Sequence, residues 1–384
     1  MRRRAVRAGW FSALVAALAF SCGAPPAESD AGGIDSGVPD AGTPSDAGAP
    51  DGGANDAGLP DGGDADAGDL DAGGTDAGTD DAGISDAGSP DAGSTDAGTP
   101  DAGPSDGGAI GADGCLLPSG QGAPFTVRVV AANLTSGNLQ SWDPGHGQRI
   151  LQGLQPDVVL IQEFNYGSNT PADIRDFVDA TFDASFSYMR GASGSIPNGV
   201  ISRWPIIASG DWTDPRVGNR AFTWAHIDLP GPRDLWAVSL HLLTTSANER
   251  NLEAQALITR LNANIPTSDF LLLGGDFNTD MRSESCISTL GQRTVTAGPH
   301  PADQAGVDGT NLNRSKPYDW VLANRCLQKS QSPVTIGSQS FDAGLVFDTR
   351  VYTPILDVAP ALASDSSAPQ MQHMAVVKDF VVQP

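Results

Sequence analysis

The stretch PDVVLIQE, residues 156–163, places four aliphatic residues directly before a glutamine and a glutamate. A short apolar run of this kind is typical of a strand that is covered on both faces, and Glu163 then stands at the end of that strand. A second stretch, FLLLGGDFN at residues 270–278, has the same form and ends in Asp276 and Asn278. Polar residues at the ends of buried strands predict a site along one edge of a sheet.

The rest of the C-terminal part alternates strand-like and helix-like runs. We expect strands at 125–131, 157–162, 200–201, 206–207, 222–229, 235–240, 270–273, 318–322 and 375–382, and helices at 150–154, 174–182 and 246–264. Ser246 and Glu249 form a capping-box pattern at the start of the last helix. Many strands with few helices predict a layered α/β sandwich.

The first third of the chain has a different composition. Residues 23–114 contain 21 acidic side chains and no lysine or arginine, so this segment carries nearly all of the net charge of −24. From Asp46 to Asp106 an aspartate recurs at every fifth residue, among alanine and glycine. Such a segment has too few apolar side chains to offset the entropy of ordering. We therefore expect a disordered linker over 23–118 and one catalytic domain over 119–384.

The N-terminus predicts export. Basic residues precede an apolar run from Trp10 to Phe20, which is too short for a membrane span and is typical of a signal peptide over 1–22. Cys22 follows that run and resembles the lipidated cysteine of a bacterial lipoprotein. The alternative is cleavage near this point without lipidation. We expect a protein that is either an outer-membrane or cell-surface lipoprotein, or secreted.

An exported chain with four cysteines favours a disulfide. If Cys22 is lipidated, three cysteines remain. Cys286 and Cys326 bracket the segment between two later motifs, and we expect this pair to be bonded. Pairings with Cys115 stay open, because connectivity does not follow from sequence.

Five motifs place polar side chains at predicted strand ends: Asn133, Glu163, His241, Asp276 with Asn278, and Asp319 followed by His373. Phosphodiester hydrolysis needs a cation for the phosphoryl oxygens, a base for water and assistance to the leaving oxygen. Oxygen ligands suit magnesium, so we expect Glu163 to be the ligand with Asn133 beside it. Asp276 is suited to activate water. Asn278 and the two histidines can stabilise phosphoryl oxygens or transfer protons.

In order and spacing, these motifs resemble those of the endonuclease/exonuclease/phosphatase superfamily, and the pancreatic-type deoxyribonucleases in particular. The resemblance covers residues 125–383 and implies a four-layer α/β/β/α sandwich. It implies a divalent cation, usually magnesium, with manganese or calcium as alternatives. It also implies that Asp319 pairs with His373 and that Asn198 orients His241.

Three basic residues are candidate phosphate contacts. Arg220 resembles a phosphate-contacting arginine of the deoxyribonuclease branch. Arg314 and Lys316 stand just before the motif that contains Asp319. Guanidinium groups bind phosphates in a bidentate manner, which suits this role.

The sequence thus predicts a monomeric, magnesium-dependent phosphodiester hydrolase, with a nuclease that cleaves DNA, or RNA, as the first hypothesis. Its only expected contact with a membrane is the lipid anchor at Cys22. The alternatives are a lipid phosphodiesterase or phosphatase of the sphingomyelinase type and a catalytically dead binding module. Trp142 and Trp212 are the aromatic residues expected in loops, and they stand apart, whereas a lipid enzyme needs an apolar loop. The complete set of polar residues argues against a dead site.

Overall fold

The computed structural model describes residues 109–192 and 194–384. The predicted signal peptide, Cys22 and most of the predicted linker therefore lie outside the described residues. Among the described residues, no helix combines the length and the apolar character needed to cross a membrane.

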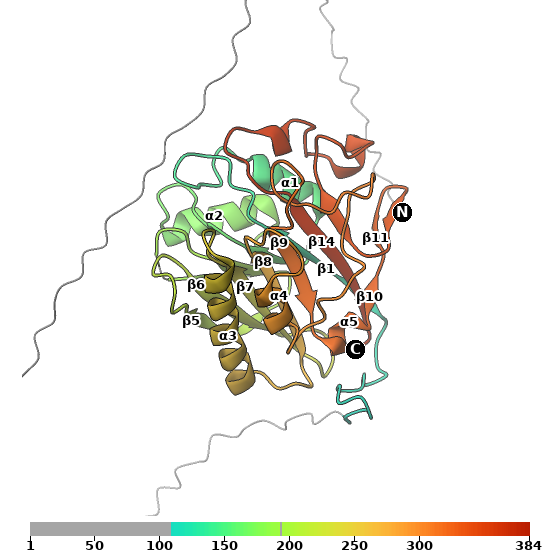
Figure 1. The fold of residues 1–384 in the computed structure, drawn as a ribbon. Coiled ribbons are helices and arrows are strands. Elements are labelled where there is room, and N and C mark those ends of the chain that lie inside the picture. The colour runs from blue at the N-terminus through green and yellow to red at the C-terminus, as the bar shows by residue number, and fades with distance from the viewer. Residues whose placement is uncertain (1–108, 193) are drawn as a thin grey trace, which may run out of the picture. The chain divides into compact units, whose positions relative to one another are not determined.

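Two β-sheets pack face to face (Figure 1). The larger sheet has the order β10 (Gln331–Ser332), β14 (Ala375–Val382), β1 (Phe125–Ala132), β2 (Val158–Ile161), β4 (Gly199–Ser202) and β3 (Ser187–Arg190), and β13 (Leu345–Phe347) also pairs with β14. The second sheet has the order β5 (Ile206–Thr213), β6 (Ala221–Ile227), β7 (Leu235–His241), β8 (Phe270–Asp276) and β9 (Asp319–Ala323). A separate hairpin joins β11 (Val334–Ile336) and β12 (Gln339–Phe341).

Helices cover the outer faces of both sheets. The larger sheet packs against α1 (His146–Leu154) and α2 (Pro171–Thr181), and the second sheet against α3 (Ala247–Asn264) and α4 (Ser285–Leu290). Two 3-10 helices, η1 (Ile355–Val358) and η2 (Asp365–Ser367), lie next to α1, and α5 (Arg325–Gln328) follows β9. This arrangement confirms the predicted α/β/β/α sandwich.

The alternation of side chains along β1 explains how one strand serves two layers. Val127, Val129 and Ala131 belong to the core between the sheets. Val130 and Ala132 face the opposite way and pack under the helices of the larger sheet. Successive side chains of a strand point to opposite faces, so a continuous apolar run is what a doubly covered strand requires.

Local sequence sets the starts of two helices. The side chain of Thr170 accepts a hydrogen bond from the amide of Asp173, the side chain of Asp173 accepts one from the amide of Thr170, and Pro171 occupies the first turn. Ser246 accepts from the amide of Glu249, as the sequence predicts. These caps satisfy amides that have no partner within the helix.

The predicted disulfide is wrong. Cys115 is bonded to Cys326, and Cys286 is a buried free thiol. The reason is that Cys286 and Cys326 lie in different layers of the sandwich. Cys286 lies in α4 and faces the core outside the second sheet, whereas Cys115 and Cys326 lie in the core between the sheets. The second sheet therefore separates Cys286 from Cys326.

Described residues on the N-terminal side of residue 119 take part in the fold. Ile110 and Leu116 form an isolated β-bridge next to the bonded Cys115. Phe125 pairs with Val382, so this N-terminal end of β1 lies beside the end of β14. Asn133 follows the other end of β1, and eight strand residues separate the two ends by about 25 Å.

Candidate active site

The ends of strands from both sheets meet at one edge of the sandwich and carry the predicted site residues. Asn133 follows β1 and Glu163 follows β2, in the larger sheet. His241, Asp276 and Asp319 lie at the ends of three neighbouring strands of the second sheet. His373 stands two residues before β14, and all six side chains are buried.

Hydrogen bonds hold the Glu163 carboxylate from three sides. Asn133 Nδ2 donates to Glu163 Oε1 at 3.2 Å and also to Asp276 Oδ2 at 3.0 Å. Thr135 Oγ1 donates to Glu163 Oε2 at 2.8 Å, and Gln140 Nε2 donates to Oε1 at 3.1 Å. Burial raises the pKa of Glu163, although Thr135 and the nearby His373 act to lower it. Asn133 thus links the two sheets through two carboxylates.

His373 lies between two carboxylates. Its Nδ1 is 3.0 Å from Asp319 Oδ2, and its Nε2 is 3.5 Å from Asp276 Oδ2. Burial acts to lower the pKa of His373, but the two carboxylates outweigh it and raise the pKa to about 10. Burial likewise raises the pKa of Asp276 to about 6. The predicted contact between Asp319 and His373 is present, with Asp276 on the far side of the ring.

His241 has the opposite electrostatic character. Its Nε2 lies 3.3 Å from Asp276 Oδ2. Burial, together with Arg220 and His373, lowers the pKa of His241 well below its usual range, so this ring is neutral. Asn198 does not make the expected contact with His241. Its Nδ2 donates instead to the carbonyl of Ala221 at 2.7 Å.

Asn278 lies at the site and forms two hydrogen bonds within the protein. Its backbone amide donates to Asp276 Oδ1 at 2.9 Å, and its side-chain Nδ2 donates to the carbonyl of Leu242 at 2.9 Å. Its φ of 51° places it in the left-handed region, which asparagine tolerates. In this geometry the amide of Asn278 orients Asp276, and the side-chain Nδ2 keeps one N–H besides the one that Leu242 accepts.

Two of the predicted phosphate contacts, Arg220 and Arg314, form hydrogen bonds or ion pairs within the protein. Arg220 is 7% exposed, and its guanidinium donates to the carbonyls of His241 and Leu242. Arg314 forms ion pairs with Asp303 and Asp348, at 2.9 Å each. Two carboxylates neutralise Arg314, whereas Arg220 is nearly buried and supports the end of β7 through the carbonyl of His241.

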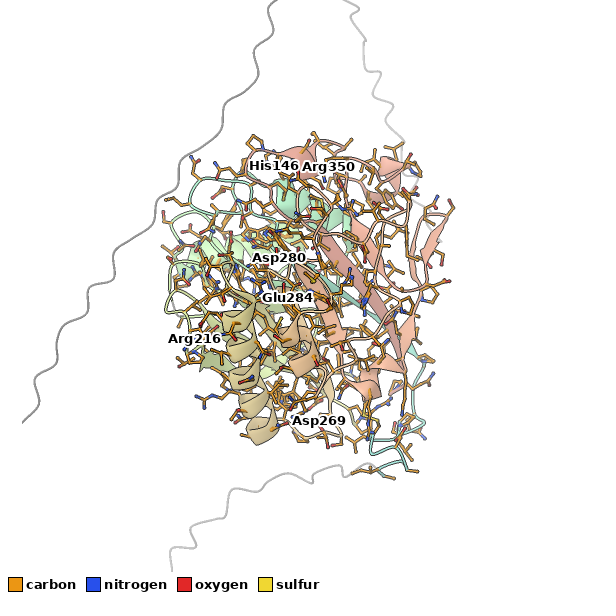
Figure 2. All side chains as sticks on the ribbon, viewed as in Figure 1. His146, Arg216, Asp269, Asp280, Glu284 and Arg350 are labelled. Atoms are coloured by element: carbon orange, nitrogen blue, oxygen red, sulfur yellow. A yellow bond between two sulfur atoms is a disulfide. The ribbon has the colours of Figure 1, made fainter. Side chains whose placement is uncertain are left out.

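Lys316 is the most exposed of the three predicted phosphate contacts. Its Nζ lies 2.5 Å from Asp280 Oδ1, and Figure 2 labels this aspartate. The ion pair leaves the side chain 43% exposed, and a partly exposed surface pair is weak. Lys316 can therefore exchange Asp280 for another anion.

The donor set fits a divalent cation. Asn133 Oδ1 and Asp319 Oδ1 are buried and have no hydrogen-bond partner within residues 109–192 and 194–384. Such buried acceptors are costly unless something satisfies them. Together with Glu163, they provide oxygen ligands of the type that magnesium, manganese or calcium prefers. Single ligand atoms of Asp276, Asp319 and His373 also lie within 4.8 Å of one another. Because His373 is an ion-pair partner of both aspartates, we assign it to proton transfer.

The sequence reasoning missed two residues that bind Glu163. Thr135 stands two residues beyond Asn133 in an extended segment, so spacing alone could have found it. Gln140 reaches Glu163 because Leu139 and Gln140 both have left-handed φ values, 57° and 56°. No motif in the sequence signals such a turn.

Fold and site together define an α/β sandwich hydrolase with carboxylate and histidine chemistry at one sheet edge. The chain belongs to the Endonuclease/Exonuclease/phosphatase family, since a sequence model of that family matches residues 148–343, just over half of the chain. Members of this family are typically metal-dependent hydrolases of phosphoester bonds. The matched range contains Glu163, His241, Asp276 and Asp319.

Solved structures with a similar fold include three bacterial proteins of this family. The protein of Beutenbergia cavernae is 17% identical, with a TM-score of 0.45 over 67% of this chain and 72% of that one. The protein of Bacteroides vulgatus is 16% identical, with a TM-score of 0.46 over 67% and 100%. The protein of Leptotrichia buccalis is 14% identical, with a TM-score of 0.46 over 67% and 99%. A comparison with curated protein sequences found no match.

Proposed function

We propose that this protein is a metal-dependent phosphodiester hydrolase that cleaves nucleic acid, with DNA as the first substrate and RNA as the second. One observation carries the hydrolase assignment. Asn133 bridges Glu163, from the end of one sheet, to Asp276, from the end of the other, beside the His373–Asp319 pair. This combines cation ligands, a carboxylate base and a protonated histidine within one buried cluster.

The side chains then have separate tasks. A divalent cation held by Asn133 and Glu163, with Asp319, would neutralise charge on the phosphoryl oxygens. Asp276 accepts the proton of the attacking water, since its carboxylate is held by Asn133 and by the amide of Asn278. His373, kept protonated by Asp319, supplies a proton or a charged donor to the departing oxygen. His241 remains neutral, with its Nε2 3.3 Å from Asp276 Oδ2.

Two tryptophans bear on the lipid alternative. Trp142 is completely buried and Trp212 lies in β5, stacked on Trp224 with ring centroids 5.6 Å apart. Trp142 is therefore not available to enter a membrane surface, and the partly buried Trp212 packs along the sheet and does not lie in a loop. A lipid phosphodiesterase of the sphingomyelinase type remains the second candidate, because single exposed aliphatic side chains such as Leu139 and Leu312 stand in loops of the domain.

The test is a set of parallel assays with plasmid DNA, RNA and sphingomyelin at low salt, with magnesium or manganese. The proposal predicts cleavage of DNA that chelator abolishes and added salt reduces. Hydrolysis of sphingomyelin with all nucleic acids left intact would show that the protein is a lipid phosphodiesterase. No activity on any of them, with either metal, would support a binding module.

The proposal includes export of a monomer, anchored through lipid at Cys22 or released. Labelling with a radioactive fatty acid in a bacterial host should mark wild-type protein and leave Cys22→Ser unmarked. Equal labelling of both proteins would exclude this anchor. Light scattering of the purified enzyme should give the mass of one chain.

A further inference from the structure

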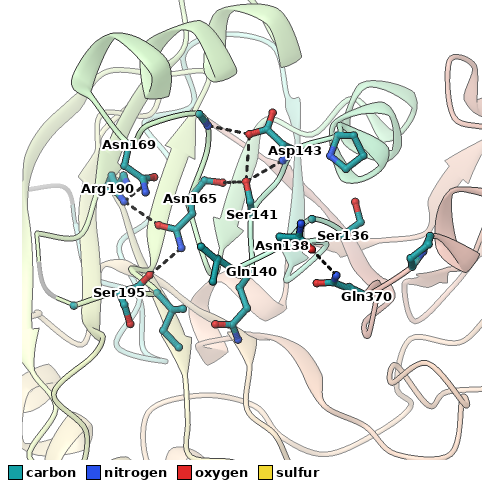
Figure 3. Close-up of a pocket in the computed structure, with 17 residues that line it drawn as sticks. Ser136, Asn138, Gln140, Ser141, Asp143, Asn165, Asn169, Arg190, Ser195 and Gln370 are labelled. Carbon is teal, nitrogen blue, oxygen red and sulfur yellow. Dashed lines mark hydrogen bonds between the residues drawn. The ribbon is translucent and has the colours of Figure 1, made fainter.

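A pocket of about 1070 Å³ opens beside the candidate active site, and the proposed catalytic steps leave it without a role. Figure 3 shows that its wall comes from the loops that follow β1, β2 and β3 and from the loop before β14. Gln140 belongs to this wall and also donates to Glu163. Gln140 therefore connects the pocket wall to the carboxylate that is expected to hold the cation, and the pocket is large enough for a nucleoside.

Side-chain amides line the pocket, and two of them form a pair. Gln370 Nε2 donates to Asn138 Oδ1 at 3.0 Å. Asn138 Nδ2 remains as a donor and Gln370 Oε1 as an acceptor. Neither atom forms another hydrogen bond within residues 109–192 and 194–384. An adjacent donor and acceptor complement the edge of a nucleobase, which asparagine and glutamine commonly recognise.

An apolar side chain stands next to this amide pair. Leu139 is 91% exposed, at the tip of a turn that the bond from the amide of Gly137 to the carbonyl of Ser141 closes. Leu139 and Gln140 both adopt the left-handed conformation, which costs free energy for residues other than glycine. The same turn brings Gln140 to Glu163 and places Leu139 where it can pack on the flat face of a base.

Arg190, at the end of β3, provides a positive charge in the wall. Its Nε donates to the carbonyl of Phe164 at 2.6 Å, and its Nη2 donates to Asn165 Oδ1 at 3.1 Å and to Asn169 Oδ1 at 3.2 Å. These partners are neutral, and no acidic group of the described residues forms a salt bridge with Arg190. Its charge is therefore available to an anion, unlike that of Arg314.

We propose that this pocket is a nucleoside subsite for unpaired nucleic acid, an inference that rests on the proposed nuclease function. The nucleoside next to the scissile phosphate enters the pocket, Leu139 packs on its base, and Asn138 and Gln370 read the base edge. Arg190 then binds the following phosphate. A base can enter such a pocket only after it leaves the stack and its partner strand. Single-stranded DNA or RNA is therefore the preferred substrate. The few available cations limit binding to a duplex backbone.

The test compares a single-stranded oligonucleotide, its duplex and bis(p-nitrophenyl) phosphate, which has no nucleoside. The variants are the double change Asn138→Ala with Gln370→Ala, and Leu139→Ser. Leu356→Ser is the matched control, because Leu356 is 82% exposed and lies outside the pocket wall. We expect the double variant and Leu139→Ser to lose about tenfold in kcat/KM on the single strand. Hydrolysis of bis(p-nitrophenyl) phosphate, which places no base in the pocket, should fall much less than cleavage of the single strand in these variants, and both activities should be unchanged in Leu356→Ser.

The outcomes separate the subsite from the proposed function. Wild-type enzyme that cleaves the duplex at least as fast as the single strand, or variants that keep full activity on the single strand, would overturn the subsite and leave the nuclease assignment intact. Wild-type enzyme that hydrolyses bis(p-nitrophenyl) phosphate but neither oligonucleotide would overturn both.

Discussion

Two roles are possible for Arg220: contact with the substrate phosphate, or support of the protein backbone at the site. The resemblance to deoxyribonucleases assigns it to the phosphate, whereas the structure gives its donors to the carbonyls of His241 and Leu242. We predict that Arg220→Met destabilises the fold. Hydrogen bonds to a charged group contribute about 1.5–3 kcal/mol each, so the loss of two should cost about 3–6 kcal/mol.

A second variant keeps the test informative if Arg220→Met does not fold. Arg220→Lys retains the charge but not the two-pronged geometry, so about half of that loss is expected. Because the strand end that carries His241 loses a support, kcat should fall while KM stays nearly constant. Arg216→Lys is the matched control, since Arg216 is 40% exposed and pairs with Glu249 on the surface (Figure 2). Its unfolding free energy should change by less than about 0.5 kcal/mol.

The assays are urea unfolding and DNA cleavage over a range of salt concentrations. A phosphate contact contributes about 0.7–0.9 to the slope of log affinity against log salt concentration. We expect Arg220→Met, which removes the charge, and wild type to have the same slope. A variant with wild-type stability and a slope reduced by about one phosphate would refute the positioning role and restore the phosphate contact.

Three further changes test other parts of the molecule. Glu163→Gln should abolish the rise in Tm that magnesium gives wild-type protein, since bound ligand stabilises the native state; an undiminished rise would place the cation elsewhere. Cys326→Ala should cost up to about 5 kcal/mol, because the bond closes a loop of 211 residues, whereas Cys286→Ala should cost about 1 kcal/mol. Non-reducing peptide maps that contain Cys286 in a disulfide would contradict this. Burial raises the pKa of Glu253 to about 8, so its stabilising effect is complete below the unfolded pKa and is lost as pH rises toward 8. Glu253→Gln should therefore flatten the fall in Tm between pH 5 and 8, and an unchanged pH profile would show that Glu253 is ionised in the native protein.

The strands and the central site residues could be predicted from the sequence for a definite reason. A buried strand leaves a continuous apolar run, and the polar residue that follows it marks the edge of the sheet. Glu163 and Asp276 have this form, Asp319 stands in the mirrored position at the start of its strand, and the sandwich brings all three together as expected. The hairpin of β6 and β7 could also be predicted from the sequence, because Pro230-Gly231-Pro232 interrupts two apolar runs.

The remaining features depend on which face of a sheet a residue reaches. Cys286 and Cys326 are 40 residues apart in sequence, but the second sheet lies between them, and no local pattern states this. Arg314 has a left-handed φ of 57° that turns its side chain toward Asp303 and Asp348. Arg190 ends a short half-buried strand, and its surroundings come from loops whose conformation the sequence does not reveal.

The position of the Cys115–Cys326 bond has a mechanical consequence. A pull on the chain at residue 109 reaches Cys115 first, and the bond passes the load to α5 and the second sheet. The residues between Cys115 and Phe125 then carry little of the tension, so the hydrogen bonds that join β1 to β14 are not the first to be stretched. Asn133, at the far end of β1, keeps its register beside Glu163 while the domain is under traction. A domain pulled from its N-terminal side would in this way bear the load without loosening its catalytic edge.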